Sequence, residues 1–198
     1  MVSLTVYDGA KGIGGNKLYL EEGGKGVLLD FGKNFGKYGV FYEEFLKNRD
    51  TRGIHDLVNL GLLPKLNIYR EDLFPSDLST KDFGELTVSA VLLSHAHMDH
   101  CGNIGALRMD IPIVASPETL VIMKGMQDTT NASIETDTTY SSLSEKEDKG
   151  GFYLGSSSKE YLGRNFLCTE PPTNELKEFI GSSPKAKKKL VSGSCTFY

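Results

Sequence analysis

The chain has 198 residues, of which 39% are hydrophobic and 24% are charged, and this composition excludes a disordered or fibrous protein. A formal net charge of −4 argues against a protein that coats nucleic acid without specificity. No apolar run reaches the roughly 18 residues of a membrane span, and the N-terminus does not resemble a signal peptide. Three widely spaced cysteines do not form a disulfide framework, so we expect a cytoplasmic protein with no membrane partner.

The first part of the chain predicts short strands followed by helices. Strands are expected at 4–7, 16–22 and 26–30, and helical spacing appears at 40–48 and 53–62. The loop at 9–15 is rich in glycine and requires tight turns. The stretch 31–39 is expected to be a loop. The third strand is apolar on both faces and ends at Asp30, which indicates a buried strand.

A longer apolar strand is predicted at 86–94, and it leads directly into His95. A further strand is expected at 111–115, followed by a helix that Ser116 caps and that ends near Gln127. The pattern then changes, because 128–150 is rich in Thr, Ser, Asp and Glu and lacks periodicity. This composition predicts a polar insertion or a flexible loop.

Three of the four histidines lie within six positions, in the sequence Ser-His-Ala-His-Met-Asp-His from Ser94 to His100. In an extended backbone His95 and His97 project to the same side and can bind one metal ion together. Asp99 and His100 follow where the chain turns into a helix, so they can reach a second ion. Imidazole and carboxylate ligands suit zinc, and also manganese or iron.

The motif resembles the metallo-β-lactamase superfamily. Within that superfamily, the chain is most similar to ribonuclease J and its β-CASP relatives. The segments that carry this resemblance are 12–16 (GIGGN), 27–32 (VLLDFG), 100–107 (HCGNIGAL) and 111–119 (IPIVASPET). The resemblance implies an α/β fold of the αβ/βα sandwich type and hydrolysis of RNA phosphodiesters.

The resemblance also implies roles for individual residues. His95, His97, Asp99 and His100 would bind two zinc ions. Asp99 would in addition be catalytic, because it would orient the attacking hydroxide. Asp30 would order the loops around the metal site from behind the ligands.

The family completes its metal site with later His and Asp ligands, whereas this chain has no histidine after His100. We therefore expect 1–127 to be the N-terminal half of the domain and 151–198 a shortened remainder of the same domain. The chain itself is then expected to be an inactive fragment. An open apolar sheet face would favour a homo-oligomer.

Two other functions remain open at this stage. The same fold and metal motif serve hydrolases of thioesters, lactones or β-lactams, and the motif does not discriminate between these substrates and RNA. Alternatively, the chain is a non-catalytic half-domain that mediates association with another chain.

Several further residues have a structural and a functional interpretation. Cys168 and Cys195 are interpreted as a buried small hydrophobe and a tail thiol rather than as replacement ligands. His55 is expected at a helix surface or cap. The Lys185–Lys189 cluster is expected to be a solvated tail, with contact to an RNA backbone as the alternative. Four aromatic residues could stack on bases but have the spacing of a helix core, namely Tyr38, Phe41, Tyr42 and Phe45.

Overall fold

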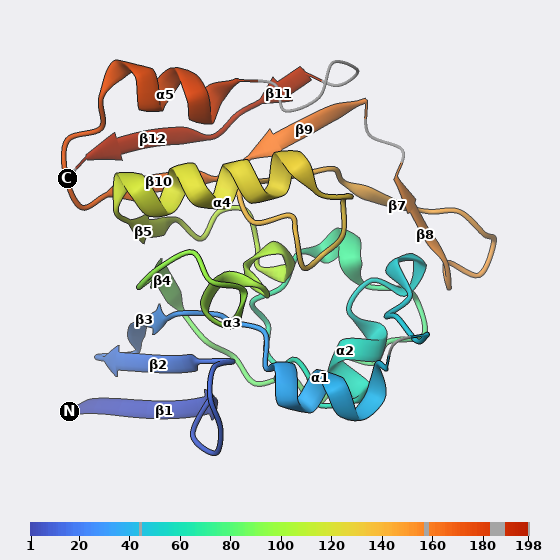
Figure 1. Ribbon diagram of the computed structural model, residues 1–198. Coiled ribbons are helices and arrows are strands. Elements are labelled where there is room, and N and C mark those ends of the chain that lie inside the picture. Colours follow the sequence, from blue (N-terminus) through green and yellow to red (C-terminus); the bar gives the residue numbers. More distant parts are fainter. Residues whose placement is uncertain (44, 157–158, 183–188, 198) are drawn as a thin grey trace.

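A mixed sheet of seven strands organises the chain (Figure 1). The computed structural model describes residues 1–43, 45–156, 159–182 and 189–197. Across the sheet the strands are β1 (Val2–Asp8), β2 (Lys17–Glu22), β3 (Lys25–Leu29), β4 (Val88–Leu92), β5 (Ile113–Ala115), β10 (Asn165–Cys168) and β12 (Ser194–Phe197). The first three strands are antiparallel neighbours, and each pair from β3 to β12 is parallel. This architecture confirms the predicted α/β fold with a mixed sheet.

Five helices and two smaller sheets are described beside this sheet. The helices are α1 (Phe35–Phe41), α2 (His55–Asn59), α3 (Met98–Cys101), α4 (Pro117–Thr129) and α5 (Asn174–Gly181). Small sheets are formed by β6 (Tyr140–Ser141), β9 (Glu160–Gly163) and β11 (Lys189–Val191), and by β7 (Ser144–Lys146) with β8 (Leu154–Ser156). Within the described residues, no helix is both long enough and apolar enough to cross a bilayer.

One face of the large sheet forms the core. The strand register aligns a row of side chains that are at most 3% exposed, namely Tyr19, Leu28, Val91, Ile113 and Phe166. These residues share one buried cluster with side chains from α2, α4 and α5. Period-two alternation explains why every second strand residue enters this cluster.

The opposite face of the sheet is also apolar, and helices do not bury it. The register places one apolar residue from each of six neighbouring strands in a single row, namely Val6, Leu18, Leu29, Leu92, Val114 and Leu167. Val6 is 46% exposed and Leu92 is 38% exposed, and the other four residues are half-buried. Leu4 and Leu20 are also exposed and face the same side.

The segment 128–150 differs from the solvated loop that its composition predicts. Ile134 and the stretch 138–141 are buried. The side-chain oxygen of Gln127 accepts hydrogen bonds from the Thr139 amide at 2.8 Å and its hydroxyl at 2.7 Å, and the Gln127 amide nitrogen donates to the Tyr140 carbonyl at 2.7 Å. Because these polar groups have internal partners, their polarity does not require solvent.

The first helix also begins earlier than the spacing predicts. Residues 35–39 were expected in a loop, but α1 starts at Phe35 because the Asn34 side chain accepts a hydrogen bond from the Lys37 amide at 3.0 Å. Tyr38 packs in the core, whereas Phe41 and Phe45 are exposed. The basic cluster expected in the tail lies mostly outside the described residues, which omit 183–188.

Candidate metal centre

The histidine motif lies at the C-terminal end of β4. Beyond Leu92 the chain stays close to β5, because the Leu93 amide donates to the Val114 carbonyl at 2.9 Å. The chain then turns at His97, which is the residue before the first turn of α3. This change from strand to helix lets consecutive residues of the motif point toward one common region.

The structure brings the motif side chains together. His95 Nε2 and His97 Nδ1 are 3.1 Å apart, and the rings of His95 and His100 have centroids 4.0 Å apart. His100 Nε2 lies 3.5 Å from an Asp99 carboxylate oxygen. The donors therefore form two adjacent pairs, one from His95 and His97 and one from Asp99 and His100.

Asp30 holds this arrangement from the end of the neighbouring strand β3. Its Oδ1 accepts the Ser94 amide at 2.8 Å, and its Oδ2 accepts the Ser94 hydroxyl at 3.0 Å and His100 Nδ1 at 2.8 Å. A carboxylate only accepts hydrogen bonds, so His100 carries a proton on Nδ1 and its Nε2 faces the Asp99 side of the motif. Asp30 adopts a φ of 57°, in the left-handed region that aspartate tolerates better than most residues.

The loop after Asp30 fixes the backbone of the motif. The Phe31 amide donates to the His100 carbonyl and the Lys33 amide donates to the Met98 carbonyl, both at 2.9 Å. Gly32 lies between them, and a Cβ at this position would overlap the Asp99 carbonyl oxygen. Only glycine allows the loop and the motif to approach this closely.

A buried lysine stabilises the same loop through its backbone. The Lys17 ammonium donates to the Gly32 carbonyl and lies 3.7 Å from an Asp8 carboxylate oxygen. Burial lowers the pKa of Lys17 to about 8, and the nearby Asp8 charge opposes this shift. Lys17 thus connects the start of β2 to the loop after Asp30, which contacts the histidine motif.

The side chains fit a metal centre in chemistry but do not complete one. Imidazole nitrogen and carboxylate oxygen are the donors that zinc prefers, and a catalytic zinc normally has three protein ligands. Among the residues that the structure describes, no group of three or more His, Cys, Asp or Glu side chains is arranged to hold a metal ion. The motif therefore supplies two incomplete donor pairs.

The other candidate residues lie apart from the motif. His55 contacts Asp56 and Asn59 on α2, in agreement with a surface role. Cys101 is buried and donates to the Ala96 carbonyl, so it packs beneath the site. Cys195 is not a tail thiol, because it lies in β12 beside Cys168.

Sequence reasoning missed three contributors to the site. Ser94 links Asp30 to the motif, and its position directly before His95 was the available signal. Gly14 approaches Asp99 so closely that a Cβ would clash, and the glycine-rich loop hinted at such a contact. The role of Lys17 has no signal in the sequence, because a lysine in a short strand normally faces solvent.

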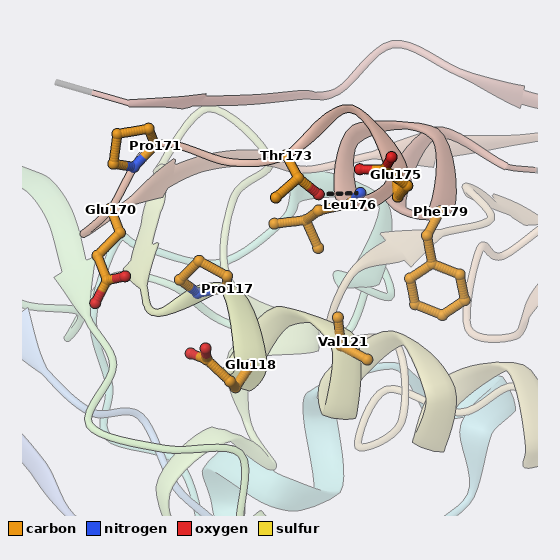
Figure 2. A pocket seen from close by; sticks show the side chains of 9 residues that line it. All are labelled: Pro117, Glu118, Val121, Glu170, Pro171, Thr173, Glu175, Leu176 and Phe179. Atoms are coloured by element: carbon orange, nitrogen blue, oxygen red, sulfur yellow. Dashed lines mark hydrogen bonds between the residues drawn. The ribbon is translucent and has the colours of Figure 1, made fainter.

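A cavity of about 490 Å³ lies between the starts of α4 and α5 (Figure 2). Its rim carries Glu118, Glu170 and Glu175, and none of its lining residues belongs to the histidine motif. Hydrogen bonds to backbone amides at the helix starts lower the pKa of Glu118 and Glu175, so both are ionised at neutral pH. An acidic rim disfavours an anionic substrate here.

Residues 56–128 match the Metallo-beta-lactamase superfamily. This segment contains the entire histidine motif together with β4, β5 and most of α4. The match confirms the resemblance that the motif predicts, and the superfamily is one of hydrolases.

Similarity to individual proteins is partial. Ribonuclease J of Methanocaldococcus jannaschii is 27% identical over 125 residues, which cover 62% of this chain and 25% of that protein. The chain therefore spans about a quarter of the length of this relative. The fold is similar to that of a protein of unknown function from Enterococcus faecalis V583, with a TM-score of 0.54 and 19% identity. That similarity covers 96% of this chain and 49% of the other.

Replacing Asp30 by Asn tests its part in the site. The variant tolerates the same backbone conformation but leaves the His100 Nδ1–H without its acceptor. We expect the free energy of unfolding to fall by about 1–3 kcal/mol. Nitrogen-15 NMR should show His100 moving from the Nδ1–H toward the Nε2–H tautomer. Asp110→Ala, at an exposed surface position, serves as the control and should change neither quantity; an unchanged His100 tautomer in Asp30→Asn would contradict the assignment.

Proposed function

We propose that this chain carries the metal-binding part of a hydrolase that cleaves RNA phosphodiesters. The observation that carries the proposal is the convergence of His95, His97, Asp99 and His100 at the end of β4. Superfamily membership of the same segment supports hydrolysis. The partial similarity to a ribonuclease J supports RNA as the substrate. The three widely spaced cysteines favour a cytoplasmic location.

Each donor pair has a separate role in this proposal. His95 and His97 bind one zinc ion, and Asp99 and His100 bind the second. Zinc, when bound, would lower the pKa of its bound water and place a positive charge near the substrate oxygen. Asp99 is also the residue that orients the attacking water through its carboxylate. Asp30 keeps His100 in the tautomer that presents Nε2.

The surface beside the motif supports an anionic substrate. A hollow of about 640 Å³ lies between the glycine-rich loop and α1, and Lys11 and Lys37 line it together with Asp8, whose carboxylate lies 3.0 Å from the Lys37 ammonium. The same loop reaches the motif, because the Gly15 amide donates to the Asp99 carbonyl at 2.9 Å. Lysines at this position attract a phosphate backbone toward the metal centre.

The two donor pairs need further ligands before either ion has a complete shell. We infer that the motif needs ligands beyond its own four side chains, so the 198-residue chain alone should not turn over substrate. Without two well-held ions the pKa of the attacking water falls too little, and the leaving oxygen is not stabilised.

The test uses single-stranded RNA labelled at its 5′ end, with Zn²⁺ or Mn²⁺ added. It compares the 198-residue chain alone with the same chain mixed with a second polypeptide that carries the later His and Asp ligands of the superfamily. We expect cleavage only in the mixture. There His97→Ala should abolish cleavage and Asp30→Asn should reduce it by roughly 10–100-fold.

The other outcomes separate the alternatives. Cleavage of a thioester, lactone or β-lactam but not of RNA would overturn the substrate and keep the metal centre. Absence of any turnover with metal bound would favour a non-catalytic half-domain that mediates association. Robust turnover by the 198-residue chain, lost in His97→Ala, would show that its own donors suffice.

We also propose that the apolar outer face of the sheet pairs with a second copy of the chain. Burying this face removes apolar surface from water, and this stabilises the dimer by roughly 25 cal/mol per Å² of apolar area buried. Light scattering should show self-association of the 198-residue chain that weakens in the double variant Leu29→Lys/Leu92→Lys. Glu178→Lys, a charge change at an exposed position of α5 on the covered side of the sheet, is the control. A wild-type chain that stays monomeric at high concentration would contradict the proposal.

A further inference from the structure

Two cysteines lie side by side at the C-terminal edge of the sheet. Strands β10 and β12 are parallel neighbours, in a register that pairs Phe166 with Cys195 and Cys168 with Phe197. Cys168 and Cys195 are therefore diagonal neighbours on the core face of the sheet. Their sulfur atoms are 3.2 Å apart, and both thiols are free.

Small molecules can reach one of the two thiols. Cys195 is half-buried and lines a cavity of about 170 Å³, together with Arg164, Lys177 and Ile180. This volume is several times the roughly 30 Å³ that one water molecule occupies in the liquid. Within the described residues β12 pairs only with β10, so an edge strand carries Cys195 and can shift slightly.

We propose that Cys168 and Cys195 form a redox modification site, at which a peroxide oxidises the two thiols to a disulfide between β10 and β12. The site is independent of the metal centre and of the proposed hydrolysis. Because stable disulfides are rare in a reducing cytoplasm, such a pair would form there reversibly.

The two cysteines have different roles in the reaction. Burial, with the neighbouring Cys195 as a second cause, raises the pKa of the Cys168 thiol to about 12, so Cys168 stays protonated. The more accessible Cys195 attacks one peroxide oxygen, the O–O bond breaks, and hydroxide leaves and takes the Cys195 proton as water. The Cys168 sulfur then attacks the Cys195 sulfur, the S–O bond breaks, and the hydroxyl leaves as water with the Cys168 proton.

The overall balance is two thiols oxidised and one peroxide reduced to two waters. The new bond joins residues that are 27 positions apart in the sequence. A crosslink over this separation restricts the unfolded chain and ties the edge strand to the sheet. The thermal midpoint should therefore rise on oxidation.

The experiment treats the purified chain with hydrogen peroxide and then counts thiols in denaturant. We expect the count to fall from three to one, since Cys101 is buried away from the pair. Tryptic mapping should show the peptide 165–177 crosslinked to 190–198. Dithiothreitol should restore all three thiols, and this readout needs no variant.

Cys195→Ser should remove both the crosslink and the rise in thermal midpoint. The matched variant Cys101→Ala should keep both effects. A thiol count that stays at three would overturn the proposal. Oxidation that ends in sulfinic acid at Cys195, or in disulfides between two chains, would also overturn it.

Discussion

The site depends on the hydrogen bonds of a single carboxylate. Asp30 at the end of β3 accepts from the amide and hydroxyl of Ser94 and from His100, so it joins two neighbouring strands to α3. Removing the Asp30 carboxylate would leave the Ser94 amide and His100 Nδ1–H without this acceptor, at a cost of roughly 1–3 kcal/mol. The arrangement of the motif histidines therefore depends on Asp30 at the end of β3 as well as on the motif itself.

Close backbone contacts add a second constraint around the same residues. Gly14 and Gly32 both approach Asp99 more closely than a Cβ allows, and the Lys17 ammonium fixes the carbonyl of Gly32. These contacts hold the loops around the motif in fixed positions, so a ligand bound there would pay less entropy for ordering them.

The sequence predicted the parts of the fold that follow from local periodicity. The strand that delivers His95 and the strand that ends at Asp30 both appear where their apolar patterns place them. Within the segment 128–150, the stretch 138–141 is buried rather than solvated, because Gln127 pairs with its polar groups, a partner that only tertiary structure supplies. The same holds for Cys195, since the pairing of β10 with β12 is not visible in a linear sequence.

The most direct test of the metal centre follows the four imidazole rings by nitrogen-15 NMR while Zn²⁺ is added. His95 and His97 should shift together, because they form one donor pair, and His100 should also shift, because it forms the adjacent pair with Asp99. His55 on α2 is a built-in control and should not change. Zinc-dependent shifts confined to His55, or motif histidines that do not respond to zinc, would contradict the account.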